Sequence, residues 1–260
     1  MKKLLMLIVI ILFGNTVIAQ DKLYLVFEFM KVDNEQENAY WDTETFWGKI
    51  QEQRTKNGDI LGWDLWSLQP GGENQGFQYL TVTLYNNPVK MMSGAGNFEA
   101  ALKTAYPKMS DEELNKKINN TAKSRDLAVR IYLEQIATTK DNFQMPMGTI
   151  AGINFMKVSD ENFEKYEKFE TETFQPIAQK EVEAGNRGNW GLMRYMLPVG
   201  SDVNATHITT DMYKDYNQLF NGGTTFSPSL SEGEINKIRE GMATRDLKYK
   251  YMATLVKKVR

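Results

Sequence analysis

The sequence predicts an α+β protein in which one module of about 110 residues is present twice. The tetrapeptide FMKV at residues 29–32 returns at residues 155–158, and RDL at residues 125–127 returns at residues 245–247. A third anchor, TETF at residues 43–46, returns at residues 171–174. Because the anchors keep their order and nearly their spacing, they indicate a duplicated architecture. The repeat predicts how the chain is built and does not identify a chemistry.

The amino terminus has the pattern of a secretory signal peptide. Lys2 and Lys3 precede an apolar run over residues 4–13, and Ala19 stands where a signal peptidase reads small residues. The run is about half as long as a bilayer span requires, so we expect no stable membrane span after cleavage. The sequence therefore predicts a signal peptide over residues 1–19 and a mature protein that is periplasmic or secreted, beginning near Gln20.

Composition excludes several classes of site. With no cysteine and one histidine, the chain cannot form disulfides or thiolate metal sites, and we expect neither a zinc centre nor any other metal site. The formal net charge is −2, and the loss of two lysines with the signal peptide makes it more negative. Nucleic-acid binding needs clustered positive charge, so no nucleic-acid partner is expected.

Each module predicts the same series of elements. Strands are indicated by short alternating apolar stretches, and the second helix of each module by a capping box, Ser110 with Glu113 and Ser231 with Glu234. The first module predicts a strand (23–32), a helix from Asp33 or Asn34 to Gly58, a hairpin (61–68 and 78–85), the capped helix and a last strand (127–136). The second predicts a strand (149–158), a helix from Ser159 or Asp160 to Gly185, a hairpin (191–197 and 206–213), the capped helix and a last strand (247–256).

One position in the first helix of each module carries a residue that weakens helices. Gly48 in the first module aligns with Pro176 in the second. Two different helix weakeners at equivalent positions predict a kink that both helices share.

The order β-α-β-β-α-β is the ferredoxin-like motif, in which both helices cover one face of a four-stranded sheet. We assign the modules to residues 20–140 and 147–260. The element order, the duplication and the helix-to-strand stretches 47–63 and 175–191 resemble the dimeric α+β barrel superfamily, in particular antibiotic-biosynthesis-monooxygenase-type domains. This resemblance implies that the modules pack sheet to sheet around a central space. Since both modules lie in one chain, it also implies a monomeric pseudo-dimer.

Strand alternation divides the side chains between two faces. We expect the apolar rows, such as Phe27 with Phe29 and Leu80 with Val82, to pack under the helices, so that the opposite rows face the partner sheet. That face would carry the candidate ligand-binding residues, which are Glu28, Trp66, Tyr79, Arg130, Tyr132, Asn154, Tyr195, His207 and Asp211. A few polar groups among aromatic ones are typical of a small-molecule pocket. Alternatively, these side chains form a solvated face or satisfy one another.

His207 is the one weak catalytic candidate, because it is the only side chain with an unperturbed pKa near neutrality. Asp211 lies too far along the same strand to bond to it, so a carboxylate partner is expected from a neighbouring strand, such as Glu28 or Glu134. No Gly-x-Ser-x-Gly motif accompanies it, and a catalytic triad is not predicted.

The favoured function is binding of a small apolar or aromatic compound between the two sheets. The resemblance implies a second possibility, a cofactor-independent monooxygenase-like enzyme, and a third reading is a non-catalytic structural or interaction scaffold. Haem is disfavoured, because haem-binding relatives use a histidine on a helix whereas His207 lies in a predicted strand. We therefore expect no cofactor.

Overall fold

The computed structural model describes residues 22–222 and 230–260, and their strands close into one antiparallel barrel. The strands are β1 (Tyr24–Lys31), β2 (Gly62–Leu68), β3 (Tyr79–Tyr85), β4 (Asp126–Thr138), β5 (Ile150–Lys157), β6 (Asn189–Leu197), β7 (His207–Tyr213) and β8 (Asp246–Val259). Their order around the barrel is β1-β3-β2-β8-β5-β7-β6-β4. All the predicted strands are present, with bounds within a few residues of those expected. The predicted signal peptide lies outside the described residues.

Each half of the chain supplies four neighbouring strands, and two seams join the halves. One seam pairs β2 with β8, from Trp63 opposite Val259 to Leu68 opposite Ala253. The other seam pairs β4 with β6. The halves are therefore hydrogen-bonded edge to edge, and this closure turns one face of every strand toward a shared interior.

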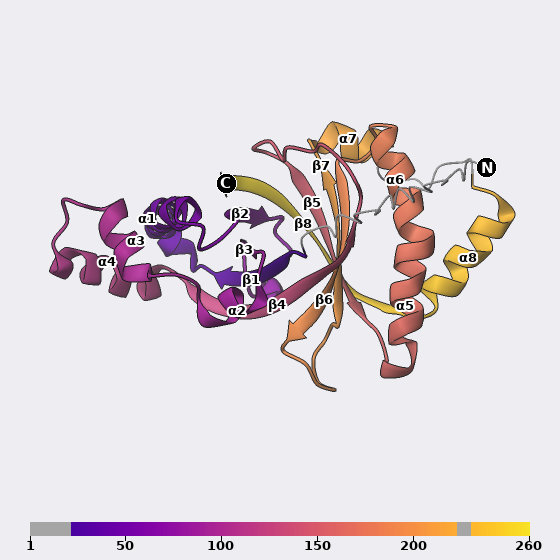
Figure 1. Cartoon of the computed structure of the whole chain (residues 1–260), viewed down its shortest axis with the longest axis horizontal. Helices are drawn as coiled ribbons and strands as arrows, with labels where there is room; N and C mark the ends of the chain where they lie inside the picture. Colours follow the sequence, from indigo (N-terminus) through magenta and orange to yellow (C-terminus); the bar gives the residue numbers. More distant parts are fainter. Residues whose placement is uncertain (1–21, 223–229) are drawn as a thin grey trace, which may run out of the picture.

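Helices cover the outside of the barrel on two opposite sides (Figure 1). Those of the first half are α1 (Glu37–Lys56), α2 (Pro88–Ser93), α3 (Phe98–Ala105) and α4 (Asp111–Ser124), and those of the second half are α5 (Phe163–Phe169), α6 (Gln175–Glu183), α7 (Tyr216–Gly222) and α8 (Glu232–Met242). Both predicted capping boxes are formed, at the starts of α4 and α8. No helix within the described ranges combines the length and apolar character that a membrane span needs.

The two halves differ at the position where a shared kink was expected. In the second half a π-helical segment, Glu170–Phe174, separates α5 from α6 just before Pro176, which has no N–H to continue the regular hydrogen bonds. In the first half α1 runs unbroken through Gly48. Gly48 instead allows a close approach, because a Cβ atom there would lie 2.6 Å from Lys257 Nζ on β8.

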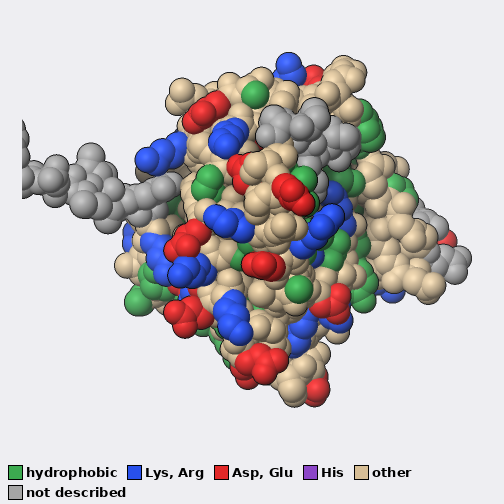
Figure 2. All heavy atoms as spheres, turned by 90° about the vertical axis from the view of Figure 1, so that its right-hand side faces the viewer, with side chains coloured by type: hydrophobic (Ala, Val, Ile, Leu, Met, Phe, Trp, Pro, Cys, Tyr) green, Lys and Arg blue, Asp and Glu red, His purple; other side chains and the backbone are tan. Residues whose placement is uncertain are grey.

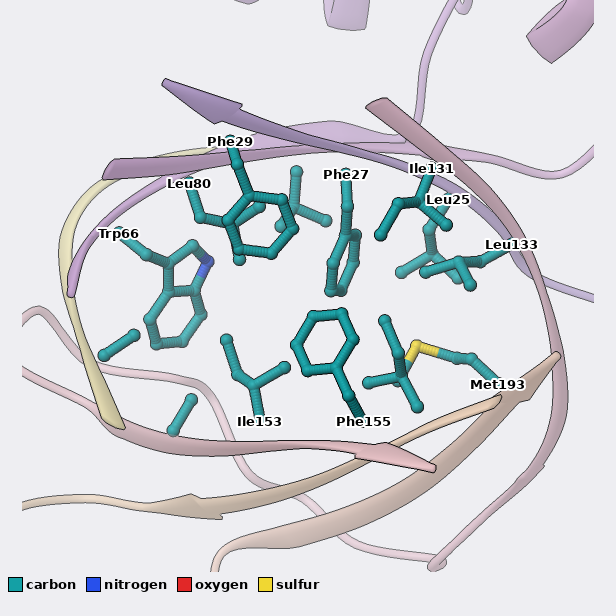
Figure 3. Packing of buried hydrophobic residues seen from close by; sticks show 14 of the residues in the cluster. Leu25, Phe27, Phe29, Trp66, Leu80, Ile131, Leu133, Ile153, Phe155 and Met193 are labelled. Atoms are coloured by element: carbon teal, nitrogen blue, oxygen red, sulfur yellow. The ribbon is translucent and has the colours of Figure 1, made fainter. Parts of the chain in front are cut away.

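The barrel interior is an apolar core to which all eight strands contribute (Figure 3). Aromatic rings occupy its middle, where the ring centroids of Phe29 and Phe155 lie 5.9 Å apart. Two further clusters fill the space between strands and helices, one around Tyr40 in the first half and one around Tyr166 in the second. Most strands are therefore covered on both faces, whereas the first residues of β4 and β8 are exposed.

The predicted orientation of the strands is wrong for most rows. The apolar rows with Phe27, Phe29, Leu80 and Val82 point into the barrel, not toward the helices. The opposite rows point toward the helices and include Glu28, Tyr79, Arg130, Tyr132, Asn154, His207 and Asp211. The interior offers few polar partners, whereas the helices supply carboxylates such as Glu37 and Glu167. Only Trp66 and Tyr195 lie inside as predicted.

The outer surface over the second-half helices carries both signs of charge. Figure 2 shows Lys and Arg interspersed with Asp and Glu over this face, without a large single-sign patch. Hydrophobic side chains are scattered singly there, which is ordinary for a protein surface.

Candidate functional site

A cavity of about 220 Å³ opens at one end of the barrel. We call it the Arg260 cavity. Its wall is apolar and its rim is polar. The wall includes Leu25, Phe27, Trp66, Val82, Ile153 and Met193, and the rim includes Asp64, Gln135, Thr138, Asp141, Asn189 and Arg260. An apolar floor with a few convergent polar groups is the usual make-up of a small-molecule site.

The main polar feature of the rim is an ion pair between Asp64 on β2 and Arg260, which follows β8. Arg260 Nη1 donates to Asp64 Oδ1 at 2.8 Å, and Nη2 donates to Oδ2 at 2.9 Å. Asp64 is 3 % exposed. Burial raises the pKa of Asp64, although the hydrogen bonds and charge of Arg260 act in the opposite direction. The seam between β2 and β8 brings these residues together from distant parts of the sequence.

Gly62 provides the space in which Arg260 folds back over β2. A Cβ atom at Gly62 would lie 2.6 Å from Arg260 Nη1 and 2.7 Å from the Val259 carbonyl oxygen. Both distances are too short for any larger residue, so glycine is required by this approach of side chain and backbone.

The segment that connects the two halves forms another part of the rim. Phe143 and Met145 line the cavity, and Asp141 accepts hydrogen bonds from Asn189 Nδ2 at 2.7 Å and the Phe143 N–H at 2.9 Å. Lys258 Nζ donates to the Gln144 carbonyl at 2.6 Å. The connection is thus held over the barrel mouth by both halves.

A second cavity, of about 190 Å³, lies at the opposite end of the barrel and is lined mainly by aromatic rings. We call it the Tyr251 cavity. Its lining includes Phe29, Phe77, Phe155, Tyr195, Tyr249 and Tyr251, and it shares no residue with the Arg260 cavity. Figure 3 shows Phe27, Phe29 and Phe155 inside the ring of strands. Phe27 lines the Arg260 cavity, and Phe29 and Phe155 line the Tyr251 cavity. Trp66 and Tyr195, both predicted site residues, therefore belong to different cavities.

His207 lies outside the barrel under α5 and is 0 % exposed. Its Nε2 is 3.1 Å from Glu167 Oε1, and its Nδ1 is 3.0 Å from Thr206 Oγ1. The carboxylate partner is therefore on a helix, and the predicted partners Glu28 and Glu134 are wrong. Burial lowers the pKa of His207 despite Glu167, so the ring is neutral and donates from Nε2 to the carboxylate.

The first half shows what this position does. Tyr79, the counterpart of His207, donates to Glu37 at 2.8 Å, and its ring lies 4.4 Å from that of Tyr40. The His207 ring lies 4.9 Å from that of Tyr166, the counterpart of Tyr40. Both side chains pack a helix onto the sheet. A groove of about 520 Å³ passes near Thr206, but the buried imidazole does not line it.

The remaining predicted site residues form paired polar groups on the helix side of the strands. Glu28 is bonded to Arg130 at 2.6 Å. Asn154 donates to Asp211 at 3.0 Å, and Arg187 binds the same carboxylate at 2.5 Å. These groups satisfy one another, as the alternative interpretation of the sequence allowed.

The polar rim, including Asp64, Asn189 and Arg260, was not among the residues predicted from the sequence. Asp64 was detectable as the one charged residue in a strand whose other residues are glycine, serine or apolar. Within residues 22–222 and 230–260, no group of histidine, aspartate and glutamate side chains is arranged to hold a metal ion.

No family profile matches the sequence, and a search of curated proteins gives no match. Solved structures do resemble it. A proposed monooxygenase from Fusobacterium nucleatum aligns with a TM-score of 0.56 at 10 % identity, covering 92 % of this chain and 94 % of its own. An anthrone oxidase-like protein aligns at 0.53 with 9 % identity, covering 92 % and 93 % of the two chains. A proposed monooxygenase from Lactobacillus acidophilus aligns at 0.51 with 10 % identity, covering 92 % and 95 %.

The chain has the fold of the dimeric α+β barrel proteins. This likeness covers nearly all of the chain. It agrees with the closed eight-stranded barrel that the strand pairing defines.

Proposed function

We propose that the protein binds a small, largely apolar or aromatic compound in the Arg260 cavity. The observation that carries this proposal is a mostly apolar chamber inside the barrel with charged and hydrogen-bonding side chains gathered at its mouth. An apolar cavity of about 150 Å³ is enough to hold benzene. A cavity of about 220 Å³ therefore suits a compound of one or two fused rings.

The wall supplies the attraction and the rim supplies the orientation. Trp66, Phe27 and Met193 offer two ring faces and a polarisable sulfur to an aromatic ligand. Burying about 150–200 Å² of apolar ligand surface contributes roughly 4–5 kcal/mol before the cost of association. Because the cost of association offsets much of this gain, a neutral two-ring compound is expected to bind with a Kd of about 1 mM or weaker.

Isothermal titration with 2-naphthamide tests the proposal. Ala151 lines the Arg260 cavity and Ala205 lines the Tyr251 cavity, and both are buried. Ala151→Leu fills the first cavity, so it is expected to weaken binding at least about tenfold, while Ala205→Leu leaves the Kd unchanged. Absence of binding to the wild type, or loss of binding only in Ala205→Leu, would contradict the proposal.

We also infer that each half is a ferredoxin-like module and that the protein acts outside the cytoplasm. The repetition of the strand order β4-β1-β3-β2 as β8-β5-β7-β6 supports the first inference. The pattern from Lys2 to Ala19 supports the second.

Cofactor-independent oxygenation is a second candidate. It is supported by structural relatives described as proposed monooxygenases or anthrone oxidase-like, and by the buried Asp64 carboxylate, whose raised pKa suits a base. For a one- or two-ring substrate, conversion of an activated CH₂ group to a ketone by O₂, with water as the second product, balances without a cofactor. Oxygen uptake that Asp64→Asn abolishes, in a variant that still binds 2-naphthamide, would favour the enzyme over the binding protein.

A further inference from the structure

We infer that the ligand of the Arg260 cavity is an aromatic carboxylate and that the Arg260 guanidinium receives its anionic group. The inference rests on the proposed function and names the chemical class of its ligand. It follows from the free donors of Arg260, the charges on the rim and a difference between the two halves.

Arg260 has donors to spare at the cavity mouth. Its side chain is 38 % exposed, and two of its nitrogens hold Asp64. Among the described residues, Nε donates to no acceptor, and Nη2 has only Met145 Sδ, at 4.0 Å, as an additional neighbour. A guanidinium matches the planar geometry of a carboxylate, and it can bind two carboxylates at once, one at each of two edges.

The arrangement of charges favours an anion over a cation. A cation would have to take Asp64 from Arg260, which would leave a guanidinium without its partner at a largely apolar mouth. An anion can approach the unused edge of Arg260 while the ion pair stays intact. Lys258 adds a second positive charge, since its ammonium group is held by the carbonyls of Gln144 and Met145.

Asp141 is the one rim carboxylate that could repel such a ligand. It is engaged by neutral donors, namely the Thr139 hydroxyl at 3.2 Å, Asn189 at 2.7 Å and the Phe143 N–H at 2.9 Å. These bonds engage both of its oxygens, Oδ1 with Phe143 and Oδ2 with Thr139 and Asn189. The charges of Asp64, Asp141, Arg260 and Lys258 sum to zero, so net charge does not decide the sign of the ligand. The unused N–H donors of Arg260 favour an anionic group.

Only one half of the duplicated chain carries the ion pair. By sequence alignment of the halves, Gly62 corresponds to Gly191 and Asp64 corresponds to Met193. A Cβ atom at Gly191 would meet nothing closer than Thr210 Oγ1 at 3.3 Å, so no guanidinium folds over it. Asp64 and Met193 both line the Arg260 cavity, so the ion pair lies on the β2 side of this mouth and not on the β6 side. Within the described part of the chain, the Tyr251 cavity has no charged residue in its lining, so an anionic ligand is expected to place its charged group at the Arg260 mouth with its ring inward.

The test compares two matched probes on the full chain by isothermal titration at pH 7. 2-Naphthoate carries the negative charge, and 2-naphthamide is its neutral isostere. Wild-type protein is expected to bind 2-naphthoate at least about tenfold more tightly, because hydrogen bonds to charged groups are stronger than neutral ones. The double variant Asp64→Asn with Arg260→Gln keeps a hydrogen-bonding pair and the net charge. It is expected to bind both probes with equal Kd, near that of wild type for 2-naphthamide.

A second variant covers the possibility that the double variant does not fold. Arg260→Lys keeps the charge but loses the planar fork, so it is expected to reduce the preference for 2-naphthoate by several-fold. Equal wild-type affinities for the two probes would overturn the inference while leaving the proposed function standing. A preference that survives in both variants would also overturn it. Binding of neither probe would overturn the proposed function itself.

Discussion

His207 and Glu167 bind each other across the layer between sheet and helix, with Nε2 of the ring 3.1 Å from Oε1 of the carboxylate. Arg194 donates hydrogen bonds to both oxygens of the same carboxylate, from Nε to Oε1 and from Nη2 to Oε2, each at 2.6 Å. Burial alone would raise the pKa of Glu167, but the bonds from His207 and Arg194 prevail and lower this pKa to about 2. The group is therefore a neutral imidazole and a firmly ionised carboxylate.

This pair predicts stepwise acid destabilisation. The pKa of His207 is lower in the folded protein than its ordinary 6.5, so stability falls as the pH drops below about 6.5, when unfolding takes up a proton. Glu167 adds a second loss as the pH falls from about 4.5 toward 2. His207→Gln removes the first step, worth at most about 1.4 kcal/mol per pH unit. Urea unfolding from pH 7 to pH 5 measures it, and an identical slope in the variant would contradict the assignment.

Glu170 predicts the opposite pH dependence. Burial raises the pKa of Glu170 to about 7, against the opposing effects of Tyr166 and Arg245. A carboxyl whose pKa is raised on folding holds its proton more tightly in the native state, so stability falls as the pH rises from about 4.5 to 7. Glu170→Gln removes this loss. Between pH 4.5 and pH 8, the free energy of unfolding of the variant is therefore expected to rise by roughly 1–3 kcal/mol relative to that of the wild type. The exposed Glu164→Gln, on α5 just before the π-helical segment, is the control and should show no such change.

The two aligned strand glycines predict unequal sensitivity to a methyl group. Gly62→Ala places a Cβ atom 2.7 Å from the Val259 carbonyl, so it strains the seam between β2 and β8. We expect a loss of about 1–3 kcal/mol in the free energy of unfolding. Gly191→Ala, whose nearest neighbour would be 3.3 Å away, should lose clearly less. Equal losses in urea denaturation would argue against strain at the seam.

Neither half should be soluble and monomeric alone. Residues 22–140 without their partner expose the inward rows of Phe27, Phe29 and Leu80 and leave the edges of β2 and β4 unpaired. We expect this fragment to self-associate or aggregate, while the whole chain stays monomeric, as measured by size-exclusion chromatography with light scattering. A monodisperse, folded monomer of the fragment would contradict this.

Cleavage of the amino terminus remains a prediction from sequence. The charged start, the apolar run over residues 4–13 and Ala19 predict that the mature protein begins at Gln20. Amino-terminal sequencing of protein from an exporting host should read Gln20 first. Retention of Met1 on a membrane-bound form would show that the segment is an anchor.

Local signals predicted most of the fold because they act over a few residues. The capping boxes at Ser110 and Ser231 fix the starts of α4 and α8, and period-two alternation marks the strands. The shared kink was predicted wrongly in the first half, since Gly48 keeps its backbone N–H and Pro176 does not. The Asp64–Arg260 pair could not be predicted, because it depends on the closure of β2 against β8.

The sequence by itself determined that this protein is one architecture built twice, with the strands and helices in a repeated order. Only the tertiary structure decided which side of each strand faces the interior, because closure buries both faces and alternation marks two faces without saying which is inner. The apolar rows turn inward, where polar partners are few. The rows with Glu28, Tyr79 and His207 turn outward, where other side chains of the strands and helices complete their hydrogen bonds.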